Sequence, residues 1–201
     1  MNQINAREKD KHMGDTASAD RLGPLSMEQM SNAQRVVAQA IIDGPRGAVY
    51  GPFVPLLRSP ELMQHAQRMG EYLRFRSAIG PRLSELAILV TARQWNQKVE
   101  WAIHAPIAAK CGIDRAIIDA IATRQAPPGL REDEAAVIDF CTELHCEKAV
   151  CDATYARARS LFGEHGIVDL MGLNGYYTFL AMIMNSARTA LPADAEWLLP
   201  D

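Results

Sequence analysis

The chain has 201 residues, 48% of them hydrophobic, and a formal net charge of −3 at pH 7, which suits one domain with a hydrophobic core. Its basic residues are scattered among acidic ones, which excludes the basic patch of a nucleic-acid-binding protein. The polar N-terminus lacks the apolar core of a secretory signal, and the apolar run at 178–184 is too short to cross a bilayer. We therefore expect a cytoplasmic protein that binds neither nucleic acid nor membrane.

The predicted elements are all helical, because no stretch alternates between apolar and polar residues over the length of a strand. In chain order, we expect helices at 26–42, 60–76, 80–95, 97–111, 115–122, 132–147, 153–162 and 167–188. Ser26 and Gln29 form a capping-box pattern before the first helix, and Ser59-Pro60 begins the second. Gly163 is expected to end the seventh helix.

The last predicted helix, at 167–188, is apolar on nearly every side. Such a helix must be covered on all faces, either by its own domain or by another subunit. We therefore expect a homo-oligomer. Residues 1–25 are expected to form a flexible N-terminal arm, followed by a single helical domain at 26–201.

The four cysteines, at 111, 141, 146 and 151, form no Cys-x-x-Cys motif and favour a reducing compartment. Cys141 and His145 lie four residues apart, a spacing that suits metal ligands on a helix. Structural zinc sites, however, use paired ligands from two segments. We therefore predict no metal site, and we expect Cys141 to be a small core residue.

The candidate chemistry lies in the fourth predicted helix and the helix before it. Glu100 and His104 are four residues apart and share one helix face, which Gln97 extends, while Glu85 comes from the preceding helix. Their neighbours are largely apolar, so we expect buried polar groups and a perturbed histidine pKa. A carboxylate that orients an imidazole beside a second acid suits general acid–base catalysis. The alternative is an exposed Glu–His pair without function.

The spacing of Glu85, Gln97, Glu100 and His104 resembles that of the carboxymuconolactone decarboxylase superfamily, which includes the AhpD-like peroxidases. The resemblance covers roughly residues 50–190 and implies an all-α, AhpD-like compact helical bundle of about six to eight helices. In the AhpD branch a Cys-x-x-Cys pair stands where this chain has Gln97 and Glu100. The chain therefore lacks the disulfide that a thiol peroxidase cycles, and it resembles the decarboxylating branch instead.

The resemblance implies a carboxy-lyase that uses no cofactor, assembles as a trimer or hexamer, and acts on a small anionic substrate, a carboxylated lactone or enolisable acid. Loss of carbon dioxide from such a lactone leaves a dienolate, which the enzyme must stabilise and then reprotonate. His104 is the predicted proton donor or shuttle. Glu100 would orient His104, and Glu85 would serve as a second acid or base.

Five further residues are predicted to bind the substrate. Gln97 can hydrogen-bond a substrate carbonyl, and Arg82 and Arg93 can bind a carboxylate in a bidentate manner. Tyr176 and Tyr177 can line the pocket from the last helix. Each has a structural alternative: an ion pair for Arg82, a place beside the core for Arg93, and core or interface packing for the tyrosines.

Two other functions stay open at this stage. One is an AhpD-like antioxidant protein that has lost its redox cysteines, and the other is a non-enzymatic oligomeric module. A thiol-dependent peroxide-reduction assay separates the first from an acid–base enzyme. A pocket that joins Glu85, Glu100 and His104 would argue against the second.

Overall fold

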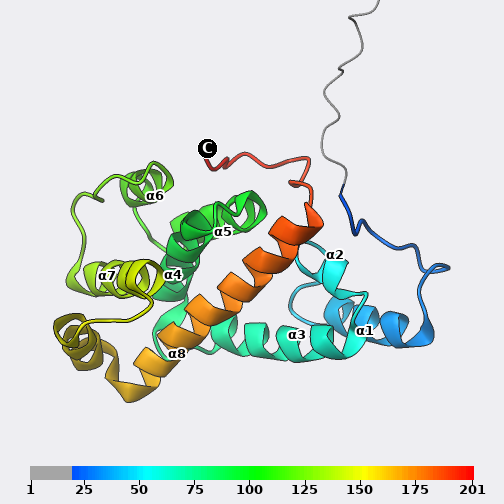
Figure 1. Cartoon of the computed structure of the whole chain (residues 1–201), viewed down its shortest axis with the longest axis horizontal. Coiled ribbons are helices and arrows are strands. Elements are labelled where there is room, and N and C mark those ends of the chain that lie inside the picture. Colours follow the sequence, from blue (N-terminus) through cyan, green and yellow to red (C-terminus); the bar gives the residue numbers. More distant parts are fainter. Residues whose placement is uncertain (1–19) are drawn as a thin grey trace, which may run out of the picture.

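A computed structural model describes residues 20–201, which form eight α-helices and no strand (Figure 1). The helices are α1 (Asn32–Ile42), α2 (Phe53–Leu56), α3 (Pro60–Phe75), α4 (Gly80–Gln94), α5 (Lys98–Lys110), α6 (Arg115–Ala122), α7 (Glu132–Glu147) and α8 (Asp152–Ala187). The prediction of an all-α bundle of six to eight helices is confirmed.

Most helix boundaries fall within one or two residues of the predicted ones, and α1 is the main exception. Ser26 N–H does donate to Gln29 Oε1 at 2.8 Å, but this pattern forms only a turn. The complete capping box is made by Ser31 and Gln34, so the helix begins at Asn32. The four-residue α2 was not predicted. It makes only about one helical turn, which is too short for a repeating pattern of apolar residues to appear in the sequence.

Gly163 bends a helix rather than ending one. It has φ +67° and ψ 179°, so the helices predicted at 153–162 and 167–188 form the two arms of one kinked element, α8. Because glycine has no Cβ, it adopts this left-handed conformation at little cost. The kink lets the second arm run across the bundle, where it packs against α3, α4 and α7.

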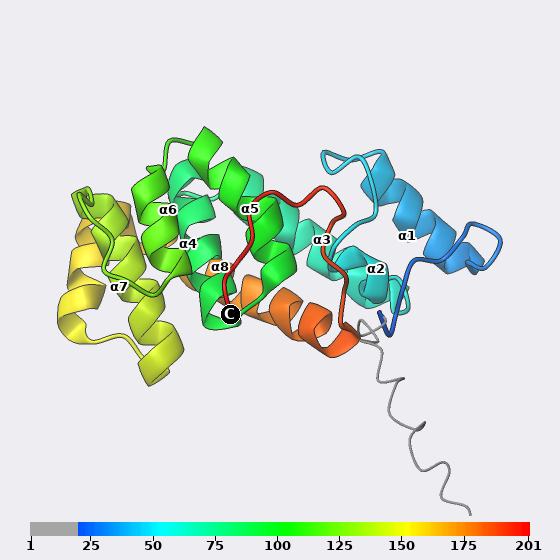
Figure 2. The ribbon, with the colours of Figure 1, turned by 90° about the horizontal axis from the view of Figure 1, so that it is seen from above.

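Helix α4 is the centre of the bundle. It packs against α5, α7 and α8, and its residues are buried without interruption from Leu83 to Arg93. Figures 1 and 2 show α6, α7 and the first arm of α8 at one end of the molecule and α1 to α3 at the other, with α4, α5 and the second arm of α8 between them. A carboxylate on α4 is therefore held away from solvent whichever way its side chain points.

The second arm of α8 is covered on most of its faces but not on all of them. Helix α8 as a whole contains a window long and apolar enough for a membrane span, and 56% of that window is buried inside the protein. Val168, Met171 and Met182 stay exposed along its outer face. This stripe is the apolar part of the arm that its own domain leaves exposed.

The described part of the predicted N-terminal arm contacts the body of the protein. Arg21 N–H donates to the carbonyl of Ala187 at 2.8 Å, and the Arg58 guanidinium donates to the carbonyls of Leu22 and Gly23. Residues 1–19 of that arm lie outside the described residues.

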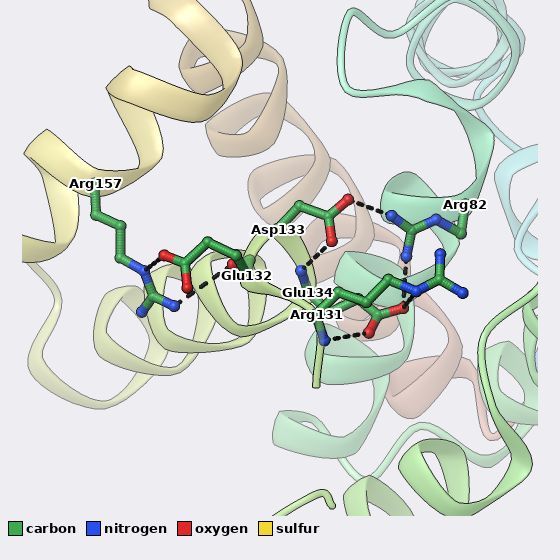
Figure 3. Close-up of polar contacts among 6 residues, drawn as sticks. All are labelled: Arg82, Arg131, Glu132, Asp133, Glu134 and Arg157. Carbon is green, nitrogen blue, oxygen red and sulfur yellow. Dashed lines mark hydrogen bonds and ion pairs between the residues drawn. The ribbon is translucent and has the colours of Figure 1, made fainter. Parts of the chain in front are cut away.

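A charged cluster joins the start of α4 to the first turn of α7. Figure 3 shows the Arg82 guanidinium donating to both Asp133 and Glu134. Glu134 is 2% exposed, and it also accepts from the backbone N–H of Arg131 at 2.9 Å. Arg157 forms a separate, more exposed pair with Glu132 of the same helix turn.

Replacing Arg82 by methionine should destabilise the protein by about 2–3 kcal/mol, because it leaves the buried Glu134 carboxylate without its main partner. Arg157→Met is the matched control. It removes two ion pairs, with Glu132 and Asp139, whose carboxylates both face solvent, and it should change stability little. Urea unfolding of the two variants measures the difference, and an equal loss in both would contradict this account.

Candidate active site

Helices α4 and α5 bring the three predicted acid–base residues together. Asn96, between the helices, has φ +47°, and this left-handed turn directs α5 back against α4. Glu85 projects from α4, whereas Glu100 and His104 project from one face of α5. All three are buried, with exposed fractions of 3%, 2% and 4%.

Both ring nitrogens of His104 face carboxylates. Nδ1 lies 2.7 Å from Glu85 Oε2, and Nε2 lies 3.3 Å from Glu100 Oε2. Burial lowers the pKa of His104, but the two carboxylates outweigh this effect and raise the pKa to about 9. His104 is therefore an imidazolium at neutral pH, with one N–H for each carboxylate.

This protonation should make stability depend on pH. The folded-state pKa of His104, about 9, lies above its ordinary value of 6.5, so the stabilisation is complete below about pH 6.5 and is lost as the pH rises through 9. We expect a loss of up to about 3 kcal/mol over this range. Urea unfolding at a series of pH values measures it. His104→Gln should remove the slope, whereas the exposed His165→Gln should keep it.

Arg74 adds a cation and Tyr177 an aromatic wall to this cluster. Arg74 Nε, from α3, lies 3.6 Å from Glu85 Oε1, and its side chain is 12% exposed. The Tyr177 ring meets the His104 ring edge to face, with centroids 5.2 Å apart, and Tyr176 packs edge to face behind Tyr177. Burial raises the pKa of both tyrosines. Tyr177 thus borders the cluster, while Tyr176 packs behind Tyr177.

A small cavity opens on this cluster. It measures about 20 Å³, which is enough for one water molecule. Glu100, His104 and Tyr177 line it, and the loop between α1 and α2 covers it with Arg46 and Tyr50. Oε1 of Glu100 is buried and has no hydrogen-bond partner among residues 20–201, so this oxygen can accept a bond from a molecule in the cavity.

Four of the five predicted substrate-binding residues do not line this cavity: Tyr176, which packs behind Tyr177, and Gln97, Arg82 and Arg93. Gln97 is the N-cap of α5: its Oε1 accepts from Val99 N–H at 2.6 Å, and its Nε2 donates to Asn185. Arg82 binds the acidic first turn of α7 instead of a ligand. Arg93 donates to the carbonyl of Pro200 at 2.9 Å and lies beside a different cavity.

No pattern in the sequence points to the two arginines of the site, Arg74 and Arg46. Arg74 lies near the end of α3, and Arg46 lies in the loop before α2, where its guanidinium stacks 4.5 Å above the Phe53 ring. Neither shares a helix or a local motif with Glu85 or His104. Only the packing of α3 and this loop against α4 and α5 could have revealed them.

The described residues contain no group of three or more histidine, cysteine or acidic side chains placed to hold a metal ion. Cys141 is fully buried, as predicted, and burial raises the pKa of its thiol to about 12. Burial and the nearby Glu85 carboxylate also raise the pKa of Cys111. No thiol beside the site is therefore activated as a nucleophile.

Comparisons with family models and with curated proteins give no match. Solved structures do match. An uncharacterized peroxidase-related protein from Silicibacter sp. TM1040 has TM-score 0.72 and 14% identity over 94% of this chain and 100% of its own. An alkylhydroperoxidase AhpD core protein from Ralstonia eutropha JMP134 has TM-score 0.71 and 15% identity over 87% and 93%. The debrominase Bmp8 has TM-score 0.67 and 13% identity over 86% and 91%.

A putative antioxidant defence protein AhpD from Agrobacterium tumefaciens also matches, with TM-score 0.62 and 17% identity over 69% of this chain and 96% of its own. Identities this low show the fold alone. The fold is AhpD-like, as the resemblance in the sequence implied.

Proposed function

We propose that the protein is a cofactor-independent acid–base enzyme that acts on a small carboxylated lactone or enolisable acid. One observation carries the proposal: a buried imidazolium, His104, is held between two carboxylates at the edge of a cavity that also has arginines. A structural ion pair needs one carboxylate and no cavity. A second carboxylate with an unpartnered oxygen in the cavity is what proton transfer to a bound molecule requires.

The charges around the cavity favour an anionic substrate. Glu85 and Glu100 supply two negative charges, and protonated His104, Arg74 and Arg46 supply three positive ones. The difference, three minus two, leaves one positive charge for a monoanion. Arginine suits the binding of such a substrate, because its guanidinium binds a carboxylate with two parallel hydrogen bonds.

The geometry favours exchanging the roles that the sequence suggested for the two glutamates. Glu85 holds the shorter contact with His104 and does not line the cavity, so it is the positioning residue. Glu100 lines the cavity and has a free oxygen, so it can pass a proton between His104 and a bound molecule.

The proposed reaction conserves charge and atoms. The substrate carboxylate leaves as carbon dioxide, and the electrons of the broken carbon–carbon bond remain on the lactone as a dienolate. The His104 imidazolium stabilises this anion and then gives its Nε2 proton to carbon. Solvent then supplies a proton to His104 through Glu100, so the net reaction consumes one proton and releases one carbon dioxide.

Substrate entry requires the loop over the cavity to move, because about 20 Å³ holds one water and not a lactone. The covering residues, Arg46 and Tyr50, lie in a loop that contains Gly47 and Gly51, both with positive φ. We propose that this loop opens to admit the substrate and closes to exclude water.

The thiol alternative has less support. Gln97 and Glu100 stand where the resembled peroxidases carry their redox cysteines, and the thiol pKa of Cys111, beside the site, is raised. The similarity to a debrominase concerns the fold and brings no second function to this chain.

Ultraviolet-monitored turnover of 4-carboxymuconolactone, with detection of the carbon dioxide released, tests the proposal on the full chain. We expect loss of the lactone without added metal, thiol or cofactor. Thiol-dependent reduction of peroxide, with no lactone turnover, would instead support the antioxidant alternative. A folded chain inactive in both assays would favour the non-enzymatic module.

We further propose a homo-oligomer, a trimer or hexamer as the resemblance implies, located in the cytoplasm. Exposed apolar residues on the outer face of α8, Val168, Met171 and Met182, support a subunit contact, together with Leu62 and Met69 of the neighbouring α3. All four cysteines are free, which suits a reducing compartment. Sedimentation of the full chain tests the subunit number.

A further inference from the structure

A second cavity, of about 210 Å³, lies where α4, α6 and α7 meet. Val90, Ile121 and Ile138 give it apolar walls, and Arg93 and Arg124 give it two cationic groups. No carboxylate of the described residues lines it. Gln94, Gln125 and Thr142 add neutral polar groups. Apolar walls with a few polar groups, whose charged members are all cationic, have the composition of a small-molecule site for an anion.

Neither arginine of this cavity has an acidic partner. Among residues 20–201, no carboxylate lies within ion-pair distance of either guanidinium. Arg93 is 7% exposed, and its Nε is buried without a hydrogen-bond partner. Arg124 donates only to neutral oxygens, the carbonyl of Arg93 at 3.2 Å and Asn96 Oδ1 at 3.0 Å.

The two guanidinium groups also repel each other. Burial is the larger cause that lowers the pKa of Arg93, and the charge of Arg124 lowers it further. Asp201 acts in the opposite direction, but its carboxylate is paired with Lys98. Arg124 is exposed to solvent, but Arg93 is buried with an unpartnered N–H beside this second positive charge, which is costly unless an anion compensates it.

A role for Arg93 as an anchor of the C-terminal segment explains only part of this arrangement. One Nη1–H donates to the carbonyl of Pro200, which accounts for a single donor of the guanidinium. It accounts neither for the unpartnered Nε nor for the placement of Arg124 at the same cavity.

We propose that this cavity binds a small organic carboxylate, whose anionic end meets Arg93 and Arg124 and whose apolar body packs against the walls. At about 210 Å³, the cavity suits a ligand of the size of benzoate. The site is separate from the His104 cavity. Arg93 lies eight residues after Glu85 on α4, which places it about 12 Å further along the helix axis. The proposal therefore does not depend on the proposed reaction.

Isothermal titration of the full chain with benzoate tests this site, with benzamide as the neutral isostere and inorganic phosphate as the anion without an apolar body. We expect saturable binding of benzoate, with benzamide and phosphate each about 10-fold weaker or more. Arg124→Asn should weaken benzoate binding about 10- to 100-fold. Asparagine tolerates the left-handed backbone at this position, where φ is +57°.

Two control variants locate the effect. Arg159→Asn removes an exposed arginine of α8 and should leave benzoate binding unchanged. Arg74→Gln removes a cation of the His104 cavity and should also leave it unchanged. Loss of benzoate binding in Arg74→Gln but not in Arg124→Asn would place the anion in the His104 cavity and overturn the proposal.

Three other results would overturn it as well: no saturable binding of benzoate with a Kd of about 1 mM or tighter, equal affinity for benzamide, or phosphate binding tighter than that of benzoate. None of these results bears on turnover of a lactone at His104, so the two proposals can fail separately.

Discussion

Replacing His104 by glutamine should lower kcat for the lactone about 10²- to 10⁴-fold, because it removes the proposed proton donor and the positive charge that would lie nearest to the developing dienolate. Glutamine keeps hydrogen-bonding groups between Glu85 and Glu100, so the fold should survive. The ultraviolet absorbance of the lactone, followed at saturating substrate concentration, measures kcat separately from KM. His165→Gln, which alters a histidine with a 70% exposed side chain, is the matched control and should keep native turnover.

The pH profile adds an independent test of the same assignment. In the proposed reaction the imidazolium form of His104 is the active one. Its pKa is raised to about 9, so turnover should persist through neutral pH and fall as the pH rises through 9. Glu85→Gln removes one of the two carboxylates that raise this pKa, and it should move the fall to lower pH. A profile that is the same in native protein and Glu85→Gln would contradict the positioning role.

The local part of the site could be predicted from the sequence. Glu100 and His104 are joined by helical periodicity, and their apolar neighbours indicated burial. Glu85 could be added because α4 and α5 are consecutive helices joined by a short turn, which makes them neighbours in space. Both contacts follow from local features of the chain. The helical period brings Glu100 beside His104, and the short turn between α4 and α5 brings Glu85 to them.

The rest of the site depends on tertiary packing. Gln97 follows the polar stripe of α5, but its position at the helix start turns its side chain to the backbone as an N-cap. Arg82 was a reasonable carboxylate ligand by its chemistry, yet it meets acidic residues some fifty positions later in the chain, on α7. Arg74 became part of the site through the packing of α3, which no local pattern reports.

The same distinction explains the fold. Caps and glycines marked most helix ends, since these signals act within a few residues. Whether Gly163 would end a helix or bend one was decided by what the following arm packs against, namely α3, α4 and α7.

Replacing Gly70 by alanine should destabilise the protein by about 1–3 kcal/mol, although alanine is the better helix former. A Cβ on Gly70 would lie 2.1 Å from Tyr176 Oη and 2.5 Å from Cζ, so the ring itself must move. Tyr176 is 3% exposed and packs on Tyr177, which in turn packs on His104. The displacement should therefore reach the site and lower turnover as well as stability.

Gly175→Ala is the matched control for this effect. Gly175 is also helical, but no heavy atom lies within 4 Å of the added Cβ, so the variant should be more stable by up to about 1 kcal/mol. Tyr176→Phe removes a hydroxyl that has no hydrogen-bond partner among the described residues, and combined with Gly70→Ala it should recover part of the loss. Urea unfolding of the three variants and the double variant measures this coupling. If Gly70→Ala proved as stable as Gly175→Ala, the tyrosine pair would not be the rigid support of His104 that its packing indicates.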